Sequence, residues 1–508
     1  MTFRFFLFVA VALLGLTPDR ATAQNVAVVA PRAATPPVIS PVSARINAVL
    51  SAPVFANAVV GVYARSLDND RVLYARNIDY ALVPASNQKL LTGSTALARL
   101  GPTFRYTTTL YRTGEVDRRG RLSGDLYLRG TGDPSLDSAA LLDMAKNLRA
   151  SGVREFSGRI VADATRFDDR VLGEGWQWDD ESADYQPQVS ALNCDENVLL
   201  WEAAAGDAPG KPVVVMMGGA NADALGFRHS RYVSVINQAV TGSADAKATL
   251  TFDRTRGRNE ITISGTLPVR AKAQSEAVTI ENPALFAATR LYELLPMAGV
   301  KTPKPEKWMV ETGTVPIDAT VAVEHSSSPL SDLLRHFLKT SDNLYGECLL
   351  KTLGAEKGAR GSVSEGATVV RAFLRERGVE SAGLYIADGS GLSRMDSVTP
   401  RLLVDLLTAW DKTEPQTTRD VFFNALPESG VDGTLRNRMK NTPAQGKIHA
   451  KTGTLFGVSS LSGYLTTTAG ERIVFSILMN QWAAGGRASD VRTAQDEIAL
   501  ALVNATRP

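Results

Sequence analysis

The sequence contains few cysteines and histidines, the residues that form disulfides and supply the nitrogen and sulfur ligands of metal sites. Its 508 residues include two cysteines and four histidines. No ligand spacing such as H-E-x-x-H links the histidines, so neither a metal site nor a cofactor is predicted. Cys194 and Cys348 can pair in an exported protein, but sequence does not show that they meet, and two buried thiols are the expected state.

An excess of charge of either sign is also missing. The chain has 55 lysines and arginines against 53 aspartates and glutamates, a formal net charge of +2. A chain this balanced lacks the electrostatic footprint of a nucleic-acid-binding protein. With 44% hydrophobic and 21% charged residues, its composition is that of a globular protein. The length exceeds that of one ordinary domain, so two or more packed units are expected.

The N-terminus has the pattern of a secretory leader. Arg4 precedes an apolar run of about a dozen residues, and Ala21-Thr22-Ala23 forms an A-x-A cleavage signal. Residues 1–23 are therefore predicted to be a signal peptide, cleaved near Ala23, with the mature protein in the periplasm. A membrane-spanning helix needs about 20 apolar residues, so an uncleaved anchor is the weaker alternative and no transmembrane anchor is expected after cleavage. Residues 24–42, rich in Ala, Val and Pro, are expected to form a flexible lead-in.

The two ends of the mature chain carry matching patterns of strands and helices. Residues 58–65 and 71–75 predict a β-hairpin, which a helix follows. Near the C-terminus, residues 459–466 and 472–480 predict two paired strands, and residues 488–503 predict a closing helix. The mirrored order indicates one unit assembled from both ends of the chain.

The region between these ends has a different pattern of predicted secondary structure. Residues 103–285 contain short β-like runs separated by Gly, Asp and Asn clusters, with one helical stretch around residues 139–150. This pattern predicts a mostly β insertion of one or two subdomains. The remaining residues, 43–102 and 286–508, are then expected to form the domain that the insertion interrupts.

An S-x-x-K tetrad, Ser86-Asn87-Gln88-Lys89, stands at the predicted start of a helix, just after Pro84. Positions i and i+3 share one helix face, which places the lysine amine beside the serine hydroxyl. A serine hydroxyl becomes a good nucleophile when a neighbouring base takes its proton, and a lysine with a lowered pKa can be that base. Such a tetrad is expected by chance about once or twice in a chain of this length. By itself it favours an ordinary helix start with an exposed Lys89.

Two further motifs change this interpretation. Ser341-Asp342-Asn343 separates two predicted helices, where Asp and Asn alone would be capping residues. Lys451-Thr452-Gly453 precedes a predicted strand, where it alone would be an edge with a turn. The S-x-x-K, S-x-N and K-T-G motifs occur once each, in this order and in these settings, and together are the signature of penicillin-binding proteins and class A β-lactamases.

Each residue of the three motifs has a chemical role in acyl transfer. Ser86 is the predicted nucleophile that forms an acyl-enzyme, and Lys89 is the predicted base. Ser341 is placed to relay a proton to the leaving amine, while Asn343 orients Lys89 or binds a substrate amide. Lys451 offers a positive charge to a substrate carboxylate.

The strand that begins with the K-T-G motif is the predicted substrate edge. The hydroxyls of Thr452 and Thr454 are further donors to the substrate. Gly453 lets a substrate backbone lie against the strand, as in β-augmentation. The N–H groups of Ser86 and Thr454 are predicted to form the oxyanion hole.

Over nearly its whole mature length the chain resembles the class C low-molecular-mass penicillin-binding proteins, which are D-alanyl-D-alanine carboxypeptidases/endopeptidases. Segments at residues 124–134, 388–394 and 430–435 carry the resemblance, together with the 255 residues that separate Ser86 from Ser341. The resemblance implies an α+β fold. It consists of a penicillin-binding/β-lactamase-like transpeptidase domain, an antiparallel sheet with helices on both sides, interrupted by extra domains.

The resemblance also implies a function. The protein is expected to be a serine hydrolase that cleaves the terminal D-Ala-D-Ala bond, or the D-amino acid cross-link, of peptidoglycan stem peptides and is acylated by β-lactam antibiotics. Asp195 is expected near the active site, on the amino group of a diamino acid side chain, although it is equally consistent with a turn residue. Two alternatives are a β-lactamase, which the absence of an E-x-x-L-N stretch disfavours, and a non-catalytic peptidoglycan-binding protein, which the complete set of motif residues disfavours.

Overall fold

The computed structural model describes residues 40–217, 230–302 and 309–506. The predicted signal peptide, residues 1–23, and all but the last three residues of the predicted lead-in lie outside these ranges. All the elements below belong to the compact unit that begins at Pro41. Within the described residues, no helix combines the length and the apolar character that crossing a membrane requires.

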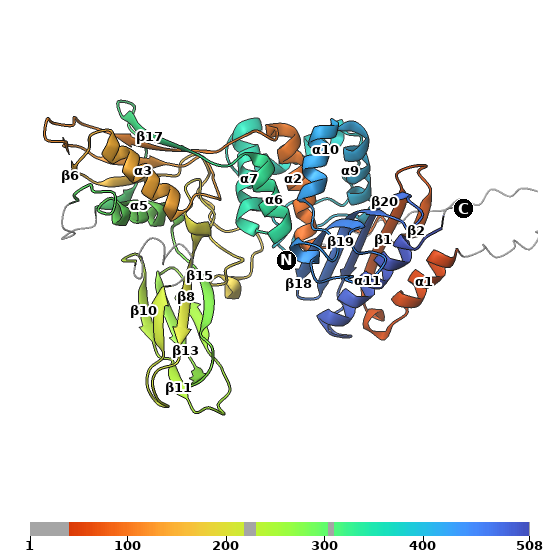
Figure 1. The fold of residues 1–508 in the computed structure, drawn as a ribbon. Coiled ribbons are helices and arrows are strands. Elements are labelled where there is room, and N and C mark those ends of the chain that lie inside the picture. The colour runs from red at the N-terminus through yellow and green to blue at the C-terminus, as the bar shows by residue number, and fades with distance from the viewer. Residues whose placement is uncertain (1–39, 218–229, 303–308, 507–508) are drawn as a thin grey trace, which may run out of the picture. The chain divides into compact units, whose positions relative to one another are not determined.

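A five-stranded antiparallel sheet unites the two ends of the chain (Figure 1). Its order is β18-β19-β20-β1-β2, with bounds Ile448–Leu455, Val458–Thr466, Arg472–Asn480, Val59–Ser66 and Val72–Arg76. The predicted N-terminal hairpin is present, and β1 pairs along its whole length with β20. Strand β18 is an edge of this sheet, so one side of its backbone is available to a substrate.

Helices cover both faces of this sheet. Helices α1 (Pro41–Leu50) and α11 (Ala488–Val503) pack on one face and share a core with the inward side chains of β1, β19 and β20. The other face is covered by a helical layer made of α2 (Gln88–Leu100), α6 (Leu330–Thr340), α7 (Asn343–Lys357), α8 (Val363–Glu376), α9 (Pro400–Thr413) and α10 (Gln416–Ala425). This is the expected α+β arrangement.

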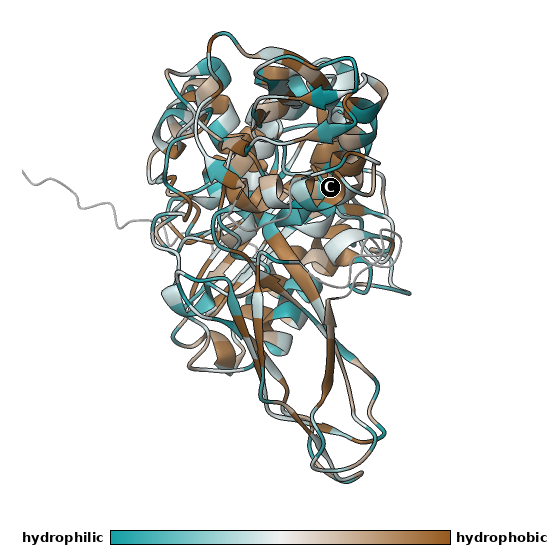
Figure 2. Ribbon diagram, turned by 90° about the vertical axis from the view of Figure 1, so that its left-hand side faces the viewer, coloured by the Kyte–Doolittle hydropathy of each residue, from teal (hydrophilic) through white to brown (hydrophobic). Residues whose placement is uncertain are grey.

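Helix α6 of this layer is amphipathic, whereas α7 is buried at every position from Leu344 to Gly354. In α6 the buried residues are Leu330, Leu333, Leu334, Phe337 and Leu338, which follow the helical spacing of one apolar stripe. Hydrophobic and hydrophilic segments alternate along the helices in Figure 2, as this periodicity requires. The stripe of α6 holds the helix against the core, and the helix therefore delivers the residues that follow it to a fixed place.

The inserted region contains a second five-stranded sheet, which is mixed. Its order is β16-β7-β5-β3-β17, with bounds Val310–Thr312, Ile160–Asp163, Leu126–Arg129, Thr107–Arg112 and Thr320–Ser326. Helices α3 (Ser138–Ala150) and α5 (Pro283–Leu294) pack with it in a separate core. Two short strands from the same part of the sequence, β4 (Arg121–Leu122) and β6 (Glu155–Phe156), pair with each other in a parallel ladder.

Smaller sheets complete the inserted region. They are β15-β8-β9 (Gln274–Thr279, Val198–Ala204, Val214–Met217), β10-β13-β12 (Ser234–Asn237, Glu260–Ser264, Thr251–Arg254) and the pair β11-β14 (Val240–Gly242, Thr266–Pro268). They form the group of strands around the β13 label in Figure 1. Cys194 and Cys348 are both buried free thiols, as expected.

The C-terminal limit predicted for the insertion, residue 285, falls inside this second core. Strand β17 pairs with β3, β16 pairs with β7, and α5 packs against α3, so the second sheet extends to Ser326 and its core to Val323. The helical pattern after residue 282 predicts that the first domain resumes there. Strand pairing across some 200 residues, which the local pattern does not report, assigns α5 to the insertion instead.

Candidate active site

Ser86 lies at the junction of a helix and the edge of the first sheet. It is the middle residue of the short 3₁₀ turn η2 (Ala85–Asn87), which leads directly into α2. The Ser460 hydroxyl donates to the Pro84 carbonyl at 2.6 Å, and the Asn87 amide donates to the Lys451 carbonyl at 2.8 Å. These bonds tie the turn to β19 and β18, so the serine is held beside the edge strand.

Lys89 is completely buried and points at the nucleophile. Its Nζ donates to Ser86 Oγ at 2.9 Å, to Asn343 Oδ1 at 2.6 Å and to the Ser390 carbonyl at 2.7 Å. Burial lowers the pKa of Lys89 from 10.5 to about 8, although nearby carboxylates, Asp388 foremost, act in the opposite direction. The amine is therefore neutral in about a tenth of the molecules at pH 7, and this fraction can act as a general base.

A buried glutamate side chain holds the loop that contacts Lys89. Glu347, on α7, accepts hydrogen bonds from the N–H groups of Gly389 and Ser390, at 3.1 and 2.9 Å. Asp388 braces the same loop by accepting from the N–H of Gly391. Burial raises the pKa of Glu347 to about 8. Its function was not visible in the sequence, because nothing local links Glu347 to a loop 42 residues away.

The S-x-N motif and the second lysine face the serine from the other side. Helix α6 ends at Thr340, Ser341 takes a left-handed conformation with φ 68°, and α7 begins at Asn343. Lys451 Nζ donates to Ser341 Oγ at 2.8 Å, and its pKa is lowered by burial and by the charge of Lys89. Asn343 uses its remaining Nδ2 group to donate to the Tyr185 carbonyl at 2.7 Å, which links α7 to the insertion.

The K-T-G motif lies inside the edge strand β18, which begins three residues earlier at Ile448, and not ahead of the strand as predicted. A side chain on Gly453 would meet the backbone nitrogen of Ser86 at 2.8 Å and the hydroxyl of Ser460 at 2.2 Å, so only glycine permits this approach. The Thr452 hydroxyl bonds with that of Thr434 at 2.7 Å. Thr454 is exposed and lines the pocket described next. The structure thus brings eight of the nine predicted residues to one place.

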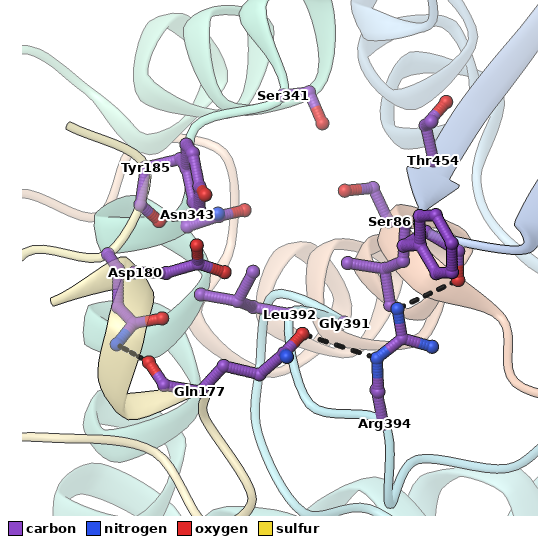
Figure 3. A pocket seen from close by; sticks show the side chains of 13 residues that line it. Ser86, Gln177, Asp180, Tyr185, Ser341, Asn343, Gly391, Leu392, Arg394 and Thr454 are labelled. Carbon is purple, nitrogen blue, oxygen red and sulfur yellow. Dashed lines mark hydrogen bonds between the residues drawn. The ribbon is translucent and has the colours of Figure 1, made fainter. Parts of the chain in front are cut away.

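A pocket of about 580 Å³ opens in front of Ser86 (Figure 3). The first domain contributes two groups of lining residues, the predicted Ser86, Ser341, Asn343 and Thr454, and the unpredicted Gly391, Leu392, Arg394, Leu455 and Phe456. The insertion supplies the wall formed by Gln177, Asp180, Tyr185 and Gln186. The pocket is therefore completed only when the two cores pack together.

The prediction for Asp195 is not supported, because this residue does not line the pocket. Its carboxylate accepts from the N–H of Ser138 at 2.8 Å and also from the Ser138 hydroxyl, at the start of α3, and it lies 3.8 Å from Arg290. The insertion carboxylate that does line the pocket is Asp180. The pKa of Tyr185 is raised to about 12, mainly by burial and secondly by the hydrogen bond with Asp180.

Asp180 and Arg394 are pocket residues that sequence reasoning missed. Arg394 belongs to the Asp388–Arg394 segment that carries the resemblance. It donates to the side chain of Gln177 at 3.3 Å, as Figure 3 shows, and to the carbonyl of Phe456 at 2.7 Å. Asp180 lies in the turn η3 (Trp178–Asp180), and no local pattern marks it. Only the packing of the insertion brings it to the pocket.

A serine with a buried lysine three residues later, at the start of a helix beside an antiparallel sheet, defines an active-serine enzyme of the penicillin-binding/β-lactamase type. Comparison with known proteins agrees. The chain matches the D-Ala-D-Ala carboxypeptidase 3 (S13) family over residues 42–503. The protein therefore belongs to this family of serine peptidases, and the predicted family, fold class and enzyme class are confirmed.

Individual relatives span most of the chain. The D-alanyl-D-alanine carboxypeptidase of Actinomadura sp. (strain R39) is 37% identical over 475 residues, which cover 90% of this chain and 83% of that protein. The D-alanyl-D-alanine carboxypeptidase DacB of Haemophilus influenzae is 27% identical and covers 86% of this chain and 88% of its own. The crystal structure of penicillin-binding protein 4 (dacB) from H. influenzae matches with a TM-score of 0.77 at 25% identity, covering 90% of this chain and 98% of that one.

Proposed function

We propose that the protein hydrolyses the terminal D-Ala-D-Ala bond, and the D-amino acid cross-link, of peptidoglycan stem peptides through an acyl-enzyme on Ser86. The observation that carries this proposal is the 2.9 Å hydrogen bond between the buried Lys89 amine and Ser86 Oγ at the floor of an open pocket. In acylation the neutral Lys89 takes the hydroxyl proton while Ser86 Oγ bonds to the substrate carbonyl carbon. The backbone N–H groups of Ser86 and Thr454 stabilise the oxyanion.

The leaving group then departs from the tetrahedral intermediate. As the C–N bond breaks, the D-alanine amine takes a proton, and the Lys451 to Ser341 hydrogen bond of 2.8 Å is the proposed donor path. Before it gives up this proton, the positive charge of Lys451 and the hydroxyls of Thr452 and Thr454 bind the terminal carboxylate of the substrate. Water then hydrolyses the ester on Ser86, which releases the shortened peptide and restores the serine.

The insertion wall supports recognition of a stem-peptide side chain. Asp180 places a half-buried carboxylate on the side of the pocket opposite Thr454, as Figure 3 shows. A carboxylate in this position favours a positively charged amino group, which a diamino acid in the stem peptide would supply. We therefore assign to Asp180 the role that was expected of Asp195.

The experiment that tests this function is covalent labelling with a fluorescent penicillin. One structure of the H. influenzae penicillin-binding protein 4 is complexed with a β-lactam, and we expect the same chemistry here. The wild type should carry a stable label on Ser86, and Ser86→Ala should carry none. If the penicillin is destroyed without stable labelling, the protein is a β-lactamase. If the penicillin stays intact and no label forms, the catalytic proposal fails.

The site of action follows from the N-terminal pattern. We propose export to the periplasm with cleavage near Ala23. N-terminal sequencing of the protein from the periplasmic fraction should give a chain that starts near Gln24. Recovery of the full-length chain from the membrane fraction would contradict this.

A further inference from the structure

A cluster of metal-ligand side chains lies beside the active site, and the proposed reaction does not use it. Among the residues that the structure describes, Glu196, His336 and Asp342 bring an imidazole nitrogen and two carboxylate oxygens within 4.8 Å of one another. His336 Nε2 is 3.5 Å from Glu196 Oε1 and 3.8 Å from Asp342 Oδ2. We propose that this cluster binds one divalent transition-metal cation of the Zn²⁺ type.

The donor set and its dimensions fit such an ion. Imidazole nitrogen together with carboxylate oxygen is a common ligand combination for zinc and its neighbours. With metal–ligand bonds of about 2.0–2.2 Å, tetrahedral ligand atoms lie roughly 3.4 Å apart, so both measured separations need only small inward movements. Three protein ligands leave a further position for water, as in open zinc sites.

Each ligand is already oriented toward the others. The His336 ring packs at a tilt of 36° against Tyr345, with 4.6 Å between ring centroids, and Nε2 faces the carboxylates of Glu196 and Asp342. Asp342 uses Oδ1 to accept the N–H of Tyr345 at 3.0 Å, and this leaves Oδ2 facing the histidine. Nε2 is covered from solvent and makes no hydrogen bond within the usual distance limits. A cation between the three groups would displace the proton of Nε2 to solvent and bind the nitrogen lone pair.

The ligands come from both halves of the molecule. Glu196 lies in the turn η4 (Asp195–Asn197) of the insertion, and His336 lies on α6. Asp342 stands between Ser341 and Asn343 of the catalytic motif. A bound cation would therefore tie the insertion to the loop that carries two active-site residues. No sequence spacing revealed this site, because its first ligand lies 140 residues before the second.

Calorimetric titration of the full mature chain with ZnCl₂ tests the proposal. The wild type should bind one Zn²⁺ ion per chain. His336→Asn and Glu196→Gln should each weaken binding by at least about tenfold, the loss that even an outer-shell partner typically causes. His325→Asn is the matched control, since His325 lies on β17 outside the cluster, and it should bind like the wild type.

Two results would overturn the proposal. Wild-type protein that takes up no Zn²⁺ would mean that the cluster is only an ion-paired contact between α6 and the insertion. Equal binding by the wild type and both ligand variants would place the ion elsewhere. Titration with Co²⁺ gives a second test that needs no variant, because three protein ligands with an open position should produce intense visible absorption bands, whereas adventitious hexahydrated Co²⁺ gives only weak ones.

Discussion

Replacing Asn343 by aspartate would place a carboxylate against the Lys89 amine with almost no change in shape. The amine now donates to Asn343 Oδ1 at 2.6 Å, and its pKa is about 8. At pH 7 about a tenth of the amine is then neutral and able to act as a base. An opposite charge this close typically shifts a pKa by about 1–3 units, here upward, since it favours the charged amine.

The expected loss follows from the neutral fraction. If acylation is proportional to that fraction, Asn343→Asp should lower the acylation rate at pH 7 by about 10- to 1,000-fold. Because the wild-type amine loses its proton near pH 8, the wild-type rate should rise with pH and level off above about that value. In the variant the same rise should occur at higher pH, so much of the loss should be recovered there.

Stopped-flow measurement of acylation by a fluorescent penicillin, from about pH 6 to about pH 10, gives both profiles. Asn343→Ala is the control, because it removes the hydrogen bonds to Lys89 and to the Tyr185 carbonyl without adding a charge. It should lower the rate without moving the midpoint upward. The reasoning is refuted if Asn343→Asp loses activity with an unshifted pH profile, since Lys89 would then not be the titrating base.

Three further predictions address the frame of the site. Gly453→Ala should lower acylation by about 100-fold or more, measured with the same penicillin, because its methyl group would displace the Ser86 backbone N–H from the oxyanion hole. Glu347→Ala should lower the free energy of unfolding by about 1–3 kcal/mol in a urea titration, because the buried N–H groups of Gly389 and Ser390 lose their acceptor. It should also slow acylation, because the hydrogen bond from Lys89 to the Ser390 carbonyl loosens. Unchanged stability would contradict this prediction. Burial lowers the pKa of His449 to about 4, below its unfolded value of 6.5, so protonation favours unfolding and stability should fall as the pH drops from 6.5 toward 4. His449→Gln should flatten that part of the curve of Tm against pH. An unaltered curve would exclude His449 as the cause of the fall in stability.

The sequence alone determined the chemistry of the nucleophile. Ser86 and Lys89 are neighbours because they lie three residues apart at a helix start, and this is a local property that spacing reports. The two terminal halves of the first sheet could be predicted for the same reason, since alternating strands and amphipathic helices leave periodic patterns. The order of the three motifs then identified the family, which comparison with known proteins confirmed.

Tertiary structure alone decided the pocket wall and the surroundings of Lys89. Asp180 and Glu347 act on groups far from them in the sequence, and neither carries a local signature. Of the two alternatives for Asp195, the structure agrees with the turn residue, because a carboxylate in a turn can face either the pocket or a helix start, and packing turned it toward Ser138. Burial, which lowers the pKa of Lys89 and makes it a base, arises from the assembly of the whole core and cannot be predicted from the tetrad that contains it.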